Sequence, residues 1–249
     1  MRLPTLAAAL LLACTCAPAA AAQNAVLRPG SAQVSGAAIP ARVEEFDIYV
    51  GDESGVRVGS MTLRTRLVTM DGTPAIARTE TTWMDDELVQ VDSFALHRQT
   101  LAPLAMWSSM TEAGVSLRFS PGRVVQVDDG DWGADTAEVP LPEPVFLSGT
   151  TDMLLGALPL APGYAATLAM YDEDAGPGVM EVRVEAEEAL RLPDGGSVSA
   201  WRVRVDEDGE ATTYWMDRES HTLVQFEADG GALRIVRSRG SRSRARPTR

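Results

Sequence analysis

The stretch Phe46-Asp47-Ile48-Tyr49-Val50-Gly51-Asp52-Glu53-Ser54-Gly55-Val56 decides the fold. Phe46, Ile48 and Val50 alternate with other side chains, and this period of two is typical of a half-buried β-strand. Turn-forming residues 51–55 follow, and a second apolar-periodic run continues to Leu67. The segment therefore predicts a β-hairpin. The apolar phase shifts at Gly59, which predicts a β-bulge there.

The same alternation of apolar and polar residues continues along the chain after the hairpin. We expect further strands over residues 75–84, 88–96, 103–110, 115–119, 123–127, 164–171, 179–186, 198–205, 211–216, 222–228 and 233–236. Residues 128–144 read as a long polar connection. One short helix is expected over residues 153–158, because Thr150-Thr151-Asp152 offers a cap before it and Pro159 closes it.

Strands and helices do not alternate along the chain, so a parallel sheet is not expected. We predict an all-β fold built as a highly curved antiparallel sheet. The sheet would form a half-barrel, either continuous or as two sheet halves, with the short helix across its concave face.

The first 22 residues predict a signal peptide. Arg2 precedes an apolar run over residues 3–13, and four alanines at 19–22 offer a cleavage site before Gln23. An alternative stays open, because Leu11-Leu12-Ala13-Cys14 resembles a lipobox in which Cys14 is acylated. We expect an exported protein of the periplasm or cell envelope, or a membrane-anchored lipoprotein through Cys14.

Composition divides the remaining chain into three parts. Residues 23–42 are rich in Ala, Ser, Gly and Pro and are predicted to be a flexible linker. Residues 43–237 hold the predicted strands and form the all-β domain. Residues 238–249 are rich in arginine and are predicted to be a disordered tail, which is either solvated or in contact with anionic lipid.

The charge of the chain excludes several functions. All 22 basic residues are arginines, against 35 acids, and the net charge is −13. The absence of lysine excludes Schiff-base chemistry and a phosphate-binding P-loop. The acidic body would repel a phosphate backbone, so no nucleic-acid partner is expected.

Catalytic and metal signatures are scarce. Cleavage before Gln23 removes both cysteines, so no disulfide or thiolate is expected in the mature chain. His221 lies beside Asp217 and Ser220, but neighbours in one turn rarely have the geometry of a triad. The cluster of acids from Asp128 to Asp135 is the kind of sequence that can bind calcium, but its spacing does not fit an EF-hand loop. We therefore expect no enzyme, no cofactor and no metal.

Large apolar residues are the most informative candidates for a site. Either they fill a core, or a sheet that does not close leaves a cavity lined by adaptable Met and Trp side chains. In the second interpretation the helix is a lid hinged at Gly149 and Pro159. The predicted apolar wall consists of Met106, Leu154, Leu155, Trp201 and Trp215.

Four motifs resemble a bacterial envelope family, domain of unknown function 3108. They are Leu158-Pro159-Leu160-Ala161-Pro162-Gly163-Tyr164, Val182-Arg183-Val184 leading to Leu192-Pro193-Asp194-Gly195-Gly196, Ala200-Trp201-Arg202-Val203, and Tyr214-Trp215-Met216-Asp217 with His221-Thr222-Leu223-Val224. The resemblance implies a secreted, curved antiparallel sheet similar to the lipoprotein-localisation carriers. It supplies no catalytic residue, because the family has no established activity.

Two functions follow as expectations. The first is an exported envelope protein that binds or carries a lipid or another apolar ligand. The alternative is a non-catalytic structural or interaction module of an envelope complex, with an envelope protein as its partner. A connected apolar cavity inside the sheet would favour the carrier, and a filled core would favour the module.

Overall fold

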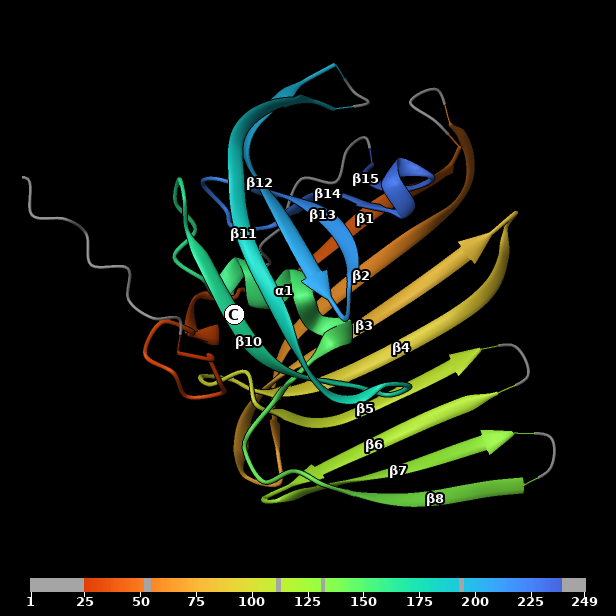
Figure 1. Cartoon of the computed structure of the whole chain (residues 1–249). Helices are drawn as coiled ribbons and strands as arrows, with labels where there is room; N and C mark the ends of the chain where they lie inside the picture. Colours follow the sequence, from red (N-terminus) through yellow and green to blue (C-terminus); the bar gives the residue numbers. More distant parts are fainter. Residues whose placement is uncertain (1–24, 52–54, 111–112, 131–132, 193–194, 239–249) are drawn as a thin grey trace, which may run out of the picture.

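A computed structural model describes residues 25–51, 55–110, 113–130, 133–192 and 195–238. These residues form one sheet of 15 strands with a short α-helix inside its curve (Figure 1). The predicted signal peptide with Cys14 lies outside the described residues, as does the arginine-rich tail from residue 239.

The strands form two runs along the sheet. The first run is β1 (Arg42–Val50), β2 (Val56–Met70), β3 (Thr73–Met84), β4 (Glu87–His97), β5 (Pro103–Met110), β6 (Gly114–Ser120), β7 (Arg123–Gly130) and β8 (Gly133–Pro140). The second run is β9 (Phe146–Leu147), β10 (Ala165–Asp172), β11 (Gly176–Arg191), β12 (Ser197–Glu207), β13 (Glu210–Asp217), β14 (Leu223–Ala228) and β15 (Leu233–Arg237). Neighbours in sequence are neighbours in each run, with β8 and β9 at the two open edges.

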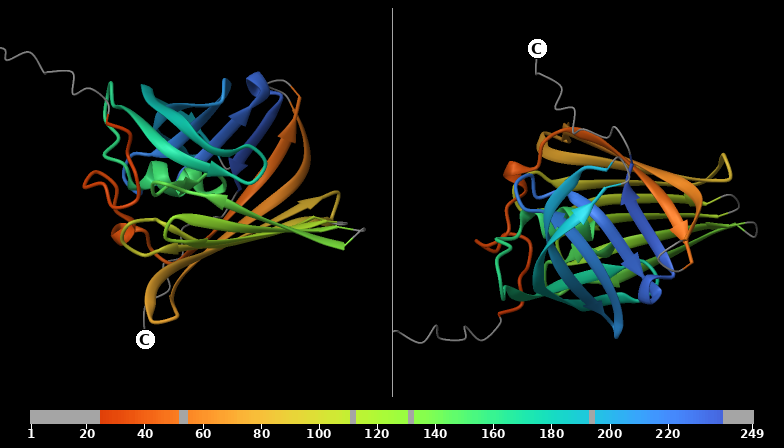
Figure 2. Two further views of the ribbon diagram at one scale, coloured as in Figure 1. Left: turned by 60° about the horizontal axis from the view of Figure 1, so that its bottom comes forward. Right: turned by 90° about the horizontal axis from the view of Figure 1, so that it is seen from above.

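The first and last strands join the two runs. β1 pairs antiparallel with β15, from Phe46 opposite Arg237 to Val50 opposite Leu233. The β1–β8 half and the β9–β15 half then curve toward each other around this seam (Figure 2). Every strand pair is antiparallel except β9 with β10, which is parallel. The predicted fold class, a highly curved and unclosed antiparallel sheet, is confirmed.

Alternation of side chains explains this geometry. In β1 the inward residues Phe46 and Ile48 are buried and their neighbours are not, as a strand with one face on the core requires. The expected bulge is confirmed, because the β1–β2 register shifts beside Gly59. A Cβ at Gly59 would lie 2.2 Å from the Trp83 carbonyl oxygen, so only glycine fits there.

The helix α1 (Thr151–Ala157) lies between the two halves and fills the curve (Figure 1). Its residues Met153, Leu154 and Leu155 are fully buried in the main core, which also holds side chains of β1–β4 and β10–β14. The helix predicted at 153–158 is therefore present, shifted by one or two residues.

The linker predicted over residues 23–42 is wrong for the described part of that segment. Leu27, Val34 and Ile39 are buried in the main core, and Leu27 forms a bridge to Leu168 on the edge of β10. Arg98 donates hydrogen bonds to the carbonyl oxygens of Gly36, Ala37 and Ile39. The segment is ordered by these long-range contacts, which its composition does not reveal.

The polar connection predicted over residues 128–144 is also wrong for the described residues up to Pro140. β7 continues to Gly130, and residues 133–140 form the edge strand β8. Asp128 lies opposite Asp135 across this hairpin. The strand was missed because its residues are exposed almost throughout and carry no apolar alternation.

Candidate functional site

The structure does not bring the five predicted wall residues together. Leu154, Leu155 and Trp201 are in the main core, whereas Met106 is in a second cluster between β4–β7 and β9–β10. Trp215 lies on the opposite face of the sheet from Met216, in a small third cluster. Its indole Nε1 donates a hydrogen bond of 2.8 Å to Glu188. One ligand could not contact all five residues.

The helix is held at both ends rather than hinged as a lid. A Cβ at Gly156 would lie 2.5 Å from the backbone carbonyl oxygen of His221, in the turn after β13. A Cβ at Gly149 would lie 2.8 Å from the ring of Phe94 on β4. These close approaches pin α1 against both halves of the sheet.

A buried charge cluster also fixes the helix. Arg78 on β3 is only 2% exposed and points inward. Its Nη1 donates a hydrogen bond of 2.8 Å to Oδ2 of Asp152 on α1, and its Nε lies 2.9 Å from Oε1 of Glu80. Burial raises the pKa of Glu80 to about 7, because the attraction of the Arg78 guanidinium only partly offsets the loss of water and the carboxylates of Asp152 and Asp92 raise it further. We call Arg78, Glu80 and Asp152 the interior charge cluster.

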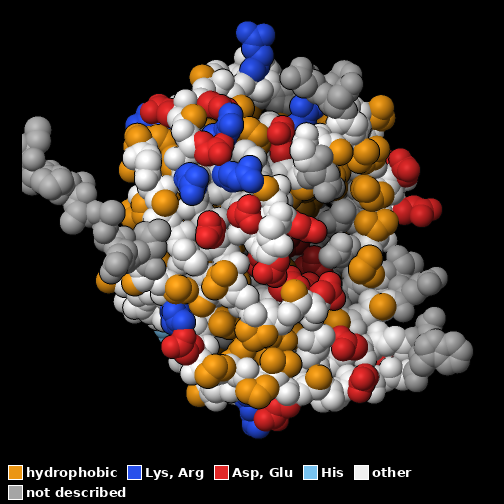
Figure 3. All heavy atoms as spheres, in the orientation of Figure 1, with side chains coloured by type: hydrophobic (Ala, Val, Ile, Leu, Met, Phe, Trp, Pro, Cys, Tyr) orange, Lys and Arg blue, Asp and Glu red, His pale blue; other side chains and the backbone are white. Residues whose placement is uncertain are grey.

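Further carboxylates lie in a hollow between the two halves, where acidic side chains gather near the centre of Figure 3. Burial raises the pKa of Glu207 to about 7, and the negative charge of Asp172 raises it further. Burial also raises the pKa of Glu173. Among the described residues, no three His, Cys, Asp or Glu side chains are placed to hold a metal ion.

The histidines have local roles. His97 Nδ1 lies 3.0 Å from Thr100 Oγ1 and accepts from the Thr100 amide in the turn after β4. The Ser220 hydroxyl is 2.8 Å from Thr222 Oγ1, and Asp217 accepts hydrogen bonds from the amides of residues 219 and 220. Asp217 and Ser220 thus organise the turn that contains His221.

The outer face of β3–β6 has an unusual composition. Its positions alternate with the buried inward residues Arg78, Phe94, Met106 and Leu117, and directly opposed residues share a face. The outward residues are Ala77, Thr79, Thr81, Trp83, Leu88, Val91, Ser93, Ala95, Ala105, Trp107, Ser109, Gly114, Ser116 and Arg118. None of them is acidic, in a chain with 35 acids. We call this surface the outer face.

A groove of about 650 Å³ runs over the outer face. One row of opposed residues crosses it, Arg66, Ala77, Ala95, Ala105 and Arg118, on β2 to β6. The three alanines form a low floor, and the long arginine side chains stand on either side.

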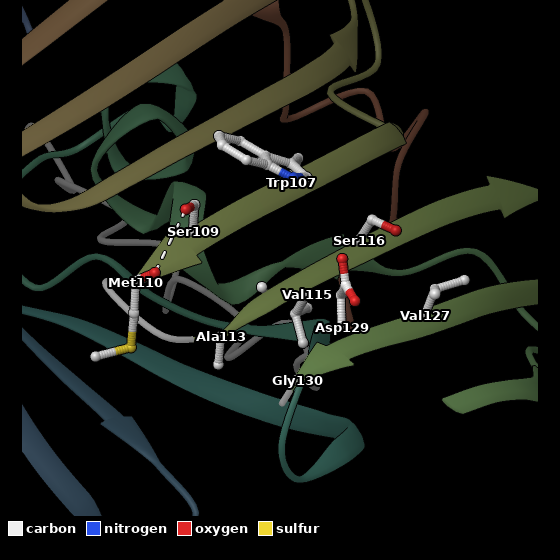
Figure 4. Close-up of a pocket in the computed structure, with 10 residues that line it drawn as sticks. Trp107, Ser109, Met110, Ala113, Val115, Ser116, Val127, Asp129 and Gly130 are labelled. Carbon is white, nitrogen blue, oxygen red and sulfur yellow. Dashed lines mark hydrogen bonds between the residues drawn. The ribbon is translucent and has the colours of Figure 1, made fainter. Parts of the chain in front are cut away.

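Trp107 stands beside this floor and is 47% exposed. It also lines a second depression of about 440 Å³ near the β5–β6 turn (Figure 4). Figure 4 shows Trp107, Ser116 and Val127 on the adjacent strands β5, β6 and β7. An exposed indole next to an alanine floor suits contact with another molecule, since aromatic side chains are enriched in interfaces.

Sequence reasoning missed both the interior charge cluster and the outer face. Arg78 occupies an inward position between Ile76 and Glu80, which the alternation of residues 75–84 already indicated. The outer face had a signal too, since the outward positions of four successive strands lack acids. Reading that signal required the cross-strand register, which the sequence does not supply.

No helix in the part of the chain that the structure describes could cross a membrane. A search of curated proteins finds no match. The family model described as "Protein of unknown function (DUF3108)" matches residues 45–236, which is more than three quarters of the chain and runs from β1 to β15. The motifs that predicted this family lie within that match. The chain therefore belongs to the DUF3108 family of proteins of unknown function.

Proposed function

We propose that this protein is an exported, non-catalytic interaction module of the cell envelope that binds a protein partner through its outer face. The observation that carries the proposal is the acid-free surface of β3–β6 with Trp107 beside the alanine-floored groove. On a chain of net charge −13, such a surface is where an acidic protein partner meets the least repulsion. The signal peptide predicted over residues 1–22 is the support for export.

The filled interior favours this module over a lipid carrier. Met153, Leu154 and Leu155 occupy the curve of the sheet at no more than 1% exposure. Gly156 already touches the backbone at His221, so α1 cannot move toward that turn. An acyl chain needs buried apolar area, about 25 cal/mol per Å², and the helix already covers that area.

One observation favours the carrier as a second candidate. A mainly apolar groove of about 410 Å³ lies where residues 141–145 cover the ends of β5–β7, lined in part by Leu104, Phe119 and Val145. A carrier would use this groove rather than the predicted wall. Displacement of a fluorescent fatty acid, lost in Leu104→Glu, would support it; no binding by the wild type excludes it. The similarity to lipoprotein-localisation carriers stays a prediction.

The module is tested by photo-crosslinking in cells. A photoreactive amino acid replaces Ser116 on the outer face, or Thr213 on the outer side of β13 as the matched control. We expect a protein adduct from position 116 and none from position 213, with the attached protein identified by mass spectrometry. Equal labelling at both positions, or no protein adduct at 116, would contradict the proposal.

A further inference from the structure

We propose that the partner on the outer face is a second copy of this chain, paired about a twofold axis. Trp107 of each copy would lie in the alanine-floored groove of the other. This inference rests on the proposed function, because it names the occupant of the same surface.

The first argument is shape. Trp107 projects from β5 at 47% exposure, and Ala105, part of the groove floor, lies two residues earlier on the same strand. The projecting Trp107 side chain (the knob) and the groove floor at Ala105 (the hole) are therefore about 7 Å apart on one face, given a rise of about 3.3 Å per residue. A face that carries a knob next to its own hole is self-complementary, as a twofold interface requires.

The second argument is charge. Two copies of a chain of net charge −13 repel each other on most approaches. The outward positions of β3–β6 hold no carboxylate, and the acid that β7 adds to this face, Asp129 opposite Gly114, lies three strands away from β4. Near the twofold axis no carboxylate of one copy would therefore meet a carboxylate of the other. Arg66 and Arg118 flank the groove, so an indole entering it gains cation–π contact with guanidinium groups.

The third argument is size, and it predicts the strength of the dimer. Six strands, β2 to β7, spaced about 4.8 Å apart and about five residues long give roughly 400–500 Å² per copy. The total of roughly 800–1,000 Å² is at the low end for specific interfaces. We therefore expect a reversible dimer with a dissociation constant in the micromolar range.

Sedimentation equilibrium of the chain from Gln23 to Arg249 tests the inference. The wild type should shift from monomer to dimer mass as its concentration rises through the micromolar range. Trp107→Glu should raise the dissociation constant at least tenfold, whereas Val179→Glu, a 49% exposed position on β11, should leave it unchanged. Circular dichroism verifies that both variants are folded.

A cysteine pair tests the axis itself. Ser93 lies directly opposite Trp107 on β4, close to the midpoint between knob and groove. Ser93→Cys should form a disulfide-linked dimer on mild oxidation, because the chain from Gln23 has no other cysteine, while Thr213→Cys should not.

Two outcomes overturn the second-copy inference: a wild type that stays monomeric at several hundred micromolar, or a dimer that Trp107→Glu leaves intact. The proposed function is judged separately by the crosslink at position 116. An adduct with a different protein would retain the function and reject the second copy, whereas no adduct would reject both.

Discussion

Replacing Arg78 with methionine should destabilise the protein strongly at alkaline pH and much less at acidic pH. Methionine keeps an unbranched, apolar stem but removes the guanidinium that lies 2.8 Å from Asp152 and 2.9 Å from Glu80. Removing one partner of a buried ion pair costs about 3–5 kcal/mol, because an uncompensated charge stays buried. We expect that loss in the free energy of unfolding of Arg78→Met at pH 8.

Acid should relieve part of this loss. Without Arg78, the state of lowest free energy of the largely buried Glu80 is protonated. A carboxyl group that is neutral in the folded state and ionised in the unfolded state gains about 1.4 kcal/mol of stability for each unit that the pH falls. The wild type gains less, because its own Glu80 titrates within the interval. The penalty should shrink by roughly 1.5 kcal/mol between pH 8 and pH 5.5.

Urea unfolding followed by tryptophan fluorescence at both pH values measures the effect. Arg204→Met, at a half-exposed arginine 3.6 Å from Asp206, is the matched control and should cost less than about 1 kcal/mol. Adding Glu80→Gln to Arg78→Met should recover part of the stability at pH 8, since a glutamine is neutral without the uphill protonation that Glu80 requires at that pH. An Arg78→Met variant that loses less than 1 kcal/mol, or the same amount at both pH values, would refute the reasoning.

Three further predictions concern other features. Gly156→Ala should destabilise by about 1–3 kcal/mol in thermal or urea unfolding, because its Cβ meets the His221 carbonyl, whereas Gly130→Ala, with open space around it, should be nearly neutral; an equally tolerated Gly156→Ala would show that α1 is not pinned. Stability of the wild type should fall as pH rises from about 4.5 through 7, since the folded-state pKa values of Glu207 and Glu80 are both raised to about 7, and Glu207→Gln should remove the part of this dependence that Glu207 contributes while the exposed Glu219→Gln should remove none. Mass analysis of the protein from cells should find Gln23 as its first residue; an acylated Cys14 would establish the lipoprotein instead, and an intact Met1 would contradict export.

The strands were predictable because their information is local. Alternation at Phe46 and Ile48 indicates a strand with one buried face, and turn residues mark its ends. The edge strand β8 was not predictable in this way, because both its faces are polar and exposed. The ordered structure of residues 25–41 was not predictable either, since it depends on contacts with Arg98 and Leu168, far along the chain.

The candidate site was less predictable, because it depends on register. Met106 and Trp107 are adjacent in sequence, yet one is buried in the core and the other projects from the outer face. Trp201 and Trp215 also lie on opposite faces. Apolar character alone cannot distinguish these sides, because a shift of one residue exchanges the two faces of a strand.

The seam between β1 and β15 sets the order in which the chain can fold. Each hairpin within a half joins neighbours in sequence, but the pairing of Phe46 with Arg237 closes a loop of almost the whole domain. The entropic cost of closure grows with loop length, so such long-range pairing forms late. β15 is also the last strand to be synthesised. Until it arrives, β1 and β14 each expose an unpaired strand edge, and in that interval the nascent chain is most open to aggregation.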